Sequence, residues 1–319
     1  MKRTLLTYVL LVISLTPACS GTTTTQKNSP AVNAADAQAA KKDDERSREL
    51  EAEIGQIAAD AKGRVGVAAL VLETGVAVSL NPRDHFPMQS VYKLPIAMAV
   101  LRRVDEGKLK LDERVRVEKS DFVREGQYSP IRDKNPKGAK LSVAELLRYA
   151  VAESDGTASD MLLNLAGGAQ AVMAFLHEIK VSEINVVNSE KEIGRDWQTQ
   201  YENWATPAAA VELLAAVNER RGLSAESQSL LWKLMVDSIR GEKRLKGQLP
   251  AGTVVAHKTG TGGTRDGVNS ATNDIGIITL PNGRHAAIAV FVSDSPTDEA
   301  TREAIIAKIA KAVWDKWGN

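Results

Sequence analysis

The chain has 319 residues, of which 43% are hydrophobic and 25% are charged. That length and composition predict a soluble globular protein with a sizeable core. The formal net charge is +1, with acidic and basic residues interspersed, so the sequence lacks the basic footprint of a nucleic-acid-binding protein.

The N-terminal segment has the pattern of an export signal. Basic residues at 1–4 precede an apolar run from Leu5 to Leu15, which is too short for the roughly 20 apolar residues of a membrane-spanning helix. We therefore predict a signal peptide over residues 1–19 and an exported, periplasmic protein. Cys19 is the only cysteine, so no intrachain disulfide can form. Lipid attachment at Cys19, which would make a membrane-anchored lipoprotein, and ordinary cleavage nearby are both open interpretations.

The first part of the mature chain is read as a tether followed by a helix. Residues 20–43 are rich in Thr, Ala and Asn and have almost no large apolar residue, a composition that predicts a flexible tether. Leu50, Ile54 and Ile57 then recur at helical spacing. This spacing predicts an amphipathic helix from about Asp44 to Ala61.

Strand patterns occur near both ends of the remaining chain. Val65 to Leu72 and Val76 to Leu80 predict a hairpin. The patterns between Pro95 and Ile239 are helical, with a capping box at residues 142–145 and an N-cap followed by proline at residues 206–207. Further strands are predicted over residues 253–259, 273–280 and 284–293, and a final helix over residues 297–317.

This order of elements predicts an α/β protein of the α+β type. An antiparallel sheet would be built from both chain ends, with flanking helices and an inserted all-helical lobe. We expect one domain over residues 44–319, with a sheet lobe at about 44–85 and 245–319 and a helical lobe at about 86–244. The cleft between the lobes is the expected place for a site.

Serine chemistry is more consistent with the sequence than metal chemistry. The four histidines have no metal-ligand spacing and no cysteine remains in the expected mature domain, so we expect neither a metal nor a cofactor. Ser90 and Lys93 lie three positions apart at the start of a helical pattern. Lys93 could therefore touch the Ser90 hydroxyl and, once deprotonated, accept its proton. Ser-x-x-Lys alone is a weak signal.

Two further motifs follow in order, namely Ser154-Asp155-Gly156 and Lys258-Thr259-Gly260-Thr261. Together with Ser-x-x-Lys they form the motif set of class A β-lactamases and penicillin-binding proteins. From about Leu50 to Trp317 the chain resembles a class A β-lactamase, and residues 198–204 resemble a cephalosporinase and extended-spectrum subgroup. The resemblance implies a β-lactamase/transpeptidase-like fold and hydrolysis of β-lactam antibiotics.

The resemblance also implies roles for single residues. Ser90 would be the nucleophile, Lys93 its activator and Ser154 the relay to the leaving nitrogen. Glu190 would activate the water that hydrolyses the acyl-enzyme; whether Glu190 or Lys93 is the base in acylation is left open. The substrate-binding residues would be Lys258, Thr259, Gly260, Thr261, Arg244, Tyr128 and Gly156, with backbone N–H groups of Ser90 and Thr261 forming the oxyanion hole.

The sequence departs from the family at two pairs of positions. Gly156 and Gly194 replace expected asparagines, which predicts lost hydrogen bonds and slow or narrow turnover. Asn188 and Asn203 replace the usual arginine and aspartate of the loop that carries Glu190. We therefore expect neutral hydrogen bonds and an altered path in that loop.

Two alternatives to a β-lactamase are considered. A penicillin-binding peptidase or slowly deacylating β-lactam sensor shares the three motifs but lacks an effective deacylating carboxylate, and Glu190 argues against it. A non-enzymatic envelope lipoprotein would not need the complete set of motif residues. We expect a monomer without a membrane span whose partner is a small β-lactam molecule.

Overall fold

The structure is a computed structural model that describes residues 34–318, with side chains from Glu45 onward. The predicted signal peptide, Cys19 and the first part of the predicted tether lie outside the described residues. Among the described residues, no helix has both the length and the apolar character that crossing a membrane requires.

The first helix, α1 (Ala34–Ala59), begins earlier than the expected start at Asp44. The expectation of a tether is therefore wrong for residues 34–43. Five of the seven residues from Ala34 to Ala40 are alanine, the residue with the highest helix propensity. Helix propensity thus extends the helix beyond the part that has an apolar face.

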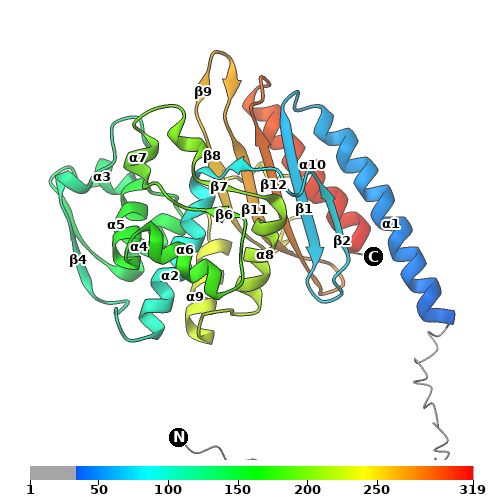
Figure 1. The fold of residues 1–319 in the computed structure, drawn as a ribbon, viewed down its shortest axis with the longest axis horizontal. Coiled ribbons are helices and arrows are strands. Elements are labelled where there is room, and N and C mark those ends of the chain that lie inside the picture. Colours follow the sequence, from blue (N-terminus) through cyan, green and yellow to red (C-terminus); the bar gives the residue numbers. More distant parts are fainter. Residues whose placement is uncertain (1–33, 319) are drawn as a thin grey trace, which may run out of the picture. The chain divides into compact units, whose positions relative to one another are not determined.

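A five-stranded antiparallel sheet joins the two ends of the chain, as predicted (Figure 1). Its strand order is β2-β1-β12-β11-β8. The N-terminal strands β1 (Arg64–Val71) and β2 (Ala77–Leu80) pair with each other, and β1 also pairs with β12 (His285–Ser293). The order continues through β11 (Thr272–Thr279) to the edge strand β8 (Val255–Thr261).

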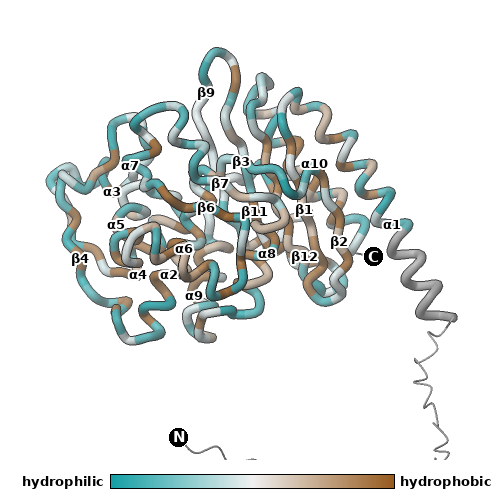
Figure 2. The backbone as a smooth tube through the Cα atoms, viewed as in Figure 1, coloured by the Kyte–Doolittle hydropathy of each residue, from teal (hydrophilic) through white to brown (hydrophobic). Residues whose placement is uncertain are grey.

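Alternate residues of β12 face two different hydrophobic cores. Ala286, Ile288 and Val290 pack in one core with residues of α1 and of the C-terminal helix α10 (Glu299–Trp317). Ala289 and Phe291 pack in the other core with the helices of the central region. This period of two is what a strand buried on both faces requires. Hydrophobic residues accordingly follow these strands and the helices beside them (Figure 2).

The central region is helical, as predicted. Its first helix is α2, whose residues from Leu94 to Leu101 are buried in the core of this region. In chain order the helices are α2 (Lys93–Asp105), α3 (Pro130–Lys134), α4 (Val143–Val151), α5 (Gly156–Ala166), α6 (Ala169–Glu178), α7 (Glu190–Ile193), α8 (Pro207–Asn218) and α9 (Ala225–Val236). The expected capping box of α4 and the N-cap of α8 are both present.

Short strands and turns connect these helices. One small sheet joins β3 (Phe86–Pro87), β7 (Trp204–Ala205) and β6 (Ile184–Asn185). Two strand pairs are β4 (Arg114–Val117) with β5 (Ala139–Ser142), and β9 (Thr264–Arg265) with β10 (Val268–Asn269). Short 3-10 helices span Gln89–Tyr92, Lys119–Asp121 and Thr199–Tyr201.

The fold class is therefore the predicted one, an antiparallel sheet with flanking helices and helices inserted between its strands. The lobe boundaries near residues 86 and 245 were drawn from the sequence and stay predictions.

Candidate active site

Ser90 lies at the wall of a cleft of about 490 Å³. It belongs to the 3-10 turn Gln89–Tyr92, and Lys93 is the first residue of the helix α2 that follows. The turn begins with Gln89 at φ +50°, a left-handed conformation that costs energy for a residue with a side chain. Lys93, Ser154 and Glu190 line the same cleft as Ser90, although they are far apart in the sequence.

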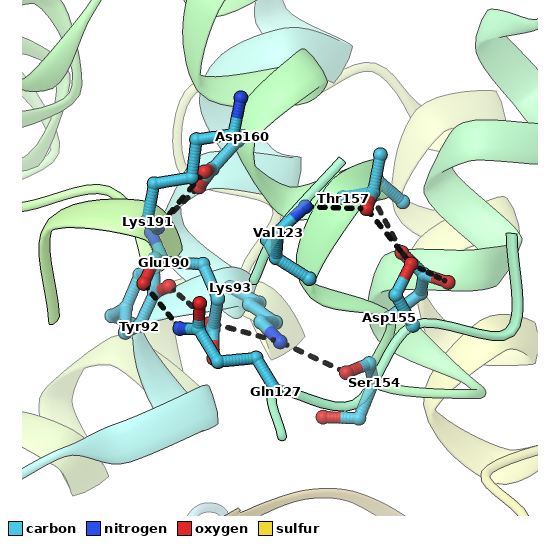
Figure 3. Close-up of polar contacts among 12 residues, drawn as sticks. Tyr92, Lys93, Val123, Gln127, Ser154, Asp155, Thr157, Asp160, Glu190 and Lys191 are labelled. Atoms are coloured by element: carbon cyan, nitrogen blue, oxygen red, sulfur yellow. Dashed lines mark hydrogen bonds and ion pairs between the residues drawn. The ribbon is translucent and has the colours of Figure 1, made fainter. Parts of the chain in front are cut away.

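The Lys93 ammonium lies between a carboxylate and a carbonyl (Figure 3). Its side chain is 1% exposed. Nζ donates a hydrogen bond of 2.9 Å to the backbone oxygen of Ser154 and lies 3.2 Å from Oε2 of Glu190. A buried cation requires such compensation because burial otherwise disfavours its charge.

Glu190 is the first residue of the short helix α7, which Ser189 caps through a capping box with Glu192. The Tyr92 hydroxyl donates a 2.6 Å hydrogen bond to Oε2 of Glu190. Burial by itself would raise the pKa of Glu190, but the Lys93 ammonium and the Tyr92 hydroxyl outweigh burial and hold that pKa below its usual value. Glu190 is thus kept ionised beside the cleft.

Asp160 forms hydrogen bonds with the backbone at the start of α7, where Glu190 lies. From α5, its carboxylate accepts hydrogen bonds from the backbone N–H groups of Glu190 at 2.6 Å and Lys191 at 3.1 Å (Figure 3). Burial raises the pKa of Asp160 to about 6, although these two N–H donors act in the opposite direction. The start of α7 is therefore tied to α5 through one buried carboxylate.

Ser154 adopts a left-handed backbone with φ +64°. Hydrogen bonds of the next residue compensate for the backbone strain at Ser154. The buried Asp155 carboxylate accepts them from the backbone N–H groups of Ile131 at 2.7 Å and Ala158 at 2.8 Å. The Ser154 hydroxyl in turn accepts a 2.9 Å hydrogen bond from Nζ of Lys258. Ser154 is thus held between two ammonium groups, with Lys93 on its carbonyl.

Lys258 reaches Ser154 from the edge strand β8 and is 1% exposed. Burial, followed by repulsion from Lys93, holds the pKa of Lys258 well below its usual value, while Asp274 and Glu190 oppose the shift. Of the residues that follow it, Thr259 and Thr261 line the cleft. Gly260 has another function, because a β-carbon there would stand 2.3 Å from the carbonyl oxygen of Met88. The glycine lets β8 approach the turn that carries Ser90.

The structure does not bring Arg244 to the wall of the cleft. Its side chain is 4% exposed and forms an ion pair with Glu303 at 3.1 Å. The guanidinium also donates to Oγ1 of Thr261 at 2.8 Å and to the carbonyl oxygen of Gly260 at 3.1 Å. Arg244 is therefore bonded to β8 and lines a neighbouring hollow of about 380 Å³ rather than the cleft of Ser90. Arg240, which the sequence analysis did not single out, lines the cleft, and its guanidinium lies 4.5 Å from the centre of the Tyr128 ring. Tyr128 is 43% exposed at the same wall.

The two glycines that depart from the family adjoin the side chains around Glu190. A β-carbon on Gly156 would stand 2.8 Å from Cγ of Glu190 and 3.2 Å from the Tyr128 carbonyl oxygen. A β-carbon on Gly194 would meet the amide of Gln127 at 2.6 Å, and that amide donates to the backbone oxygen of Glu190. The space of the missing side chains is therefore occupied rather than empty.

Neutral hydrogen bonds close the loop that carries Glu190, as expected from Asn188 and Asn203. Oδ1 of Asn203 accepts from the backbone N–H groups of Val187 and Asn188, each at 2.9 Å, and its Nδ2 donates to the Asn188 carbonyl oxygen at 2.8 Å. Glu202 adds one charged acceptor for the Asn188 side chain at 2.8 Å. The expected change in the path of this loop stays a prediction.

Sequence analysis missed Tyr92, Asp160, Gln127 and Arg240. Tyr92 and Asp160 had only weak signals, because each lies on a helix that starts at a motif but has no motif position of its own. The Ser189–Glu192 capping box was a usable signal for the helix under Glu190. Among the described residues, no group of three or more His, Cys, Asp or Glu side chains is placed to hold a metal ion.

Comparison with known proteins points to one family. The model of the "Beta-lactamase enzyme family" matches residues 49–317. The chain is 44% identical over 267 residues to the extended-spectrum β-lactamase PER-1 of Pseudomonas aeruginosa, covering 83% of this chain and 86% of that protein. It is 42% identical over 258 residues to β-lactamase VEB-1 of the same organism, covering 80% of this chain and 86% of that protein.

Solved structures agree with this result. A β-lactamase from Chitinophaga pinensis is 45% identical with a TM-score of 0.82, covering 84% of this chain and 98% of that one. The TLA-1 extended-spectrum β-lactamase is 43% identical with a TM-score of 0.83, covering 86% and 99%. The chain belongs to the β-lactamase enzyme family, as a class A serine β-lactamase.

Proposed function

We propose that this β-lactamase opens its substrate through an acyl-enzyme on Ser90 and hydrolyses that intermediate with water activated by Glu190. The observation that carries the proposal is the position of the Glu190 carboxylate. It lies 3.2 Å from the Lys93 ammonium and 2.6 Å from the Tyr92 hydroxyl, in the cleft that Ser90 lines.

In acylation, the Ser90 oxygen bonds to the carbonyl carbon of the β-lactam and the carbon–nitrogen bond of the ring breaks. The Ser90 proton leaves to Lys93 or Glu190. Ser154 gives its own proton to the leaving nitrogen and regains one through Lys93, so that in total one proton moves from Ser90 to the nitrogen. The 2.9 Å hydrogen bond from Nζ of Lys258 to the Ser154 hydroxyl supports this relay. The backbone N–H groups of Ser90 and Thr261 would stabilise the negative oxygen that forms.

In deacylation, a water gives its proton to Glu190 and attacks the ester carbon, and the proton returns to Ser90 as the ester bond breaks. The lowered pKa of Glu190 supports this role, because a general base must be ionised at neutral pH. Lys258, Thr259 and Thr261 would bind the substrate at the edge of β8.

The test combines a chromogenic cephalosporin with Ser90→Ala and Glu190→Gln. We expect sustained turnover by the unchanged protein and none by Ser90→Ala. Glu190→Gln should turn over roughly 10² to 10⁴ times more slowly and should accumulate an acyl-enzyme visible by mass spectrometry. One equivalent of product followed by silence from the unchanged protein would instead indicate a slowly deacylating sensor, and the proposal would fail.

We also propose that the protein is exported and acts as a monomer. The N-terminal pattern of basic residues and an 11-residue apolar run from Leu5 to Leu15 supports export. Lipid attachment at Cys19 is tested by Cys19→Ser, since a lipoprotein would lose its partition into detergent with membranes. Light scattering of the purified protein tests the monomeric state.

A further inference from the structure

Gln200 has a buried side-chain amide in the wall of the cleft. It lies in the 3-10 turn Thr199–Tyr201, in the loop that follows α7. Its Nε2 donates a 2.7 Å hydrogen bond to the carbonyl oxygen of Trp197. Its Oε1 accepts two hydrogen bonds, from Nε2 of Gln89 at 2.8 Å and from the hydroxyl of Ser270 at 2.7 Å. This one amide therefore joins three segments of the chain that are far apart in the sequence.

The partners of the Gln200 amide determine its orientation. A carbonyl oxygen can only accept a hydrogen bond, so the amide nitrogen of Gln200 must face Trp197. The amide oxygen must then face Gln89 and Ser270, which both act as donors. Gln89 is 9% exposed and Ser270 is completely buried. Removal of the Gln200 oxygen would therefore deprive two buried donors of their nearest acceptor, which is unfavourable.

Gln89 lies in the turn that carries the proposed nucleophile. It directly precedes Ser90 and has φ +50°, a strained conformation that persists only where neighbouring groups hold it. On its N-terminal side, Nδ2 of Asn273 donates to the carbonyl oxygen of Met88 at 3.2 Å. The hydrogen bond to Gln200 holds the Gln89 side chain itself. The backbone N–H group of Ser90 thus belongs to a turn that both contacts stabilise.

Ser270 lies opposite the chain that leaves β8. Thr261 is the last residue of β8. Directly after it, the backbone N–H of Gly262 donates to the Ala271 carbonyl oxygen at 2.8 Å, and the backbone N–H of Ser270 donates to the Gly263 carbonyl oxygen at 3.0 Å. A β-carbon on Gly262 would clash with Oγ of Ser270, so the glycine leaves the space for this hydroxyl. Ser270 therefore holds the chain beside Thr261.

The proposed oxyanion hole consists of the backbone N–H groups of Ser90 and Thr261. We propose that Gln200 is a positioning residue that fixes the spacing of these two N–H groups. Its single Oε1 binds the side chain that precedes Ser90 and the side chain that lies beside the end of β8. This inference rests on the proposed function. Donors that are held in place before the reaction stabilise a developing negative oxygen best, so Gln200 would act on the rate through the oxyanion hole.

Stopped-flow kinetics with a chromogenic cephalosporin test this role. A negative oxygen forms in acylation and again in deacylation, so Gln200→Ala should lower both rate constants roughly 10- to 100-fold. The dissociation constant of the substrate before acylation should change by about threefold or less, because the negative oxygen exists only once attack has begun. Unchanged rate constants, a loss in only one of the two steps, or a loss confined to substrate binding would overturn the proposal.

The same substitution in Glu190→Gln separates the oxyanion hole from the general base. Glu190→Gln should accumulate the acyl-enzyme, so the rate at which this intermediate forms can be measured. Adding Gln200→Ala should slow its formation by the same factor as in the unchanged protein, because the carboxylate of Glu190 is already absent. No slowing in this background would mean that Gln200 acts only through the position of Glu190, and the proposal would fail.

A double-variant cycle tests the contact between the two amides. Gln89→Ala should slow both steps as Gln200→Ala does, and the double variant should lose about twofold or less beyond the slower single variant. Gln89→Gly should lose less than Gln89→Ala, because glycine adopts a positive φ without strain. Fully additive losses would show that the two side chains act independently. Additive losses, or equal losses in Gln89→Gly and Gln89→Ala, would contradict the proposal.

Gln198→Ala is the matched control. Gln198 lies two positions before Gln200 in the same loop, is exposed and does not belong to the wall of the cleft, so we expect each rate constant to change by about twofold or less. A loss equal to that of Gln200→Ala would assign the effect to the loop in general and would overturn the proposal.

Ser270→Ala is the second variant in case Gln200→Ala does not fold. It removes one of the two donors to Oε1 of Gln200 and should slow both steps roughly 3- to 10-fold; no slowing would overturn the proposal. Failure of the proposed function is distinguishable, because the unchanged protein would then form no acyl-enzyme on Ser90 or would not hydrolyse it.

Discussion

Glu190 fills the space that a side chain on Gly156 would need, with its Cγ 2.8 Å from the position of a β-carbon there. Gly156 stands at the start of α5 and Glu190 at the start of α7. The missing asparagine in the Ser-Asp-Gly motif is thus coupled to the position of the carboxylate. The glycine at position 156 thus leaves the space that the Glu190 side chain occupies.

This coupling predicts that restoring the asparagine is harmful. Gly156→Asn should displace Glu190 and slow deacylation roughly 10- to 100-fold, the effect of losing about one well-placed hydrogen bond. Burst kinetics on a chromogenic cephalosporin measure deacylation separately from acylation. Gly55→Ala in α1 is the control, because a β-carbon there meets nothing within 4 Å. Faster deacylation in Gly156→Asn would contradict this prediction, because it would show that Gly156 only removes a useful hydrogen bond.

Tyr92→Phe should move the acidic limb of the pH profile of kcat to higher pH. The Tyr92 hydroxyl is one of the groups that hold the pKa of Glu190 low. Without it, burial raises that pKa, and a higher pH is needed to ionise the base. A profile that keeps its acidic limb while its plateau falls would mean that Tyr92 contributes only packing.

Asp274→Asn should move the alkaline limb of kcat/KM to lower pH. Asp274 opposes the lowering of the pKa of Lys258, so its removal lets Lys258 lose its proton at a lower pH. The Asp274 carboxylate is completely buried and lies 2.9 Å from Nδ1 of His257. We therefore also expect a loss of stability on the order of 1–3 kcal/mol. An unchanged alkaline limb with reduced stability would restrict Asp274 to a structural role.

Asp160 should make stability depend on pH. Its pKa is raised to about 6 from an ordinary value of 3.8, so its protonated form favours folding below about pH 4 and this contribution is lost as the pH rises through 6. The unchanged protein loses this stability between pH 4 and pH 7, whereas Asp160→Asn does not. The free energy of unfolding of the variant minus that of the unchanged protein should therefore be larger at pH 7 than at pH 4, by roughly 1–3 kcal/mol. Urea unfolding at the two pH values measures this difference. A hydrogen bond that the substitution removes equally at both pH values does not contribute to the difference. Equal differences at both pH values would contradict the prediction.

Ile54→Ala should destabilise the domain by about 2–5 kcal/mol. Ile54 of α1 is completely buried in the core that also contains Ile288 and Ile309. The neighbouring Gln56 is exposed, and Gln56→Ala should change the free energy of unfolding by about 0.5 kcal/mol or less. Urea unfolding of both variants gives the comparison, and equal effects would mean that α1 is not part of the cooperative core.

The fold was largely predictable because its signals are local. Successive residues of β12 point to opposite faces of the sheet, so Ile288 and Ala289 lie in two different cores. This period of two can be read from a few consecutive residues. The N-caps of α4 and α8 likewise depend on side-chain and backbone groups that are only three positions apart in the sequence. The start of α1 was missed because alanines without an apolar face signal a helix only by propensity.

The positions of Ser90 and Lys93 could be named from a three-residue spacing that suits nucleophilic chemistry. Ser154, Glu190 and Lys258 could be named only because the motif set resembles that of class A β-lactamases. Tertiary structure alone decided which arginine lines the cleft of Ser90, since Arg240 and Arg244 lie in the same turn segment after α9 but only Arg240 belongs to the wall of that cleft. It alone also placed Tyr92 and Asp160 around Glu190. Hydrogen bonds between groups that are 30 to 98 positions apart depend on how whole elements pack, and no local pattern encodes that packing.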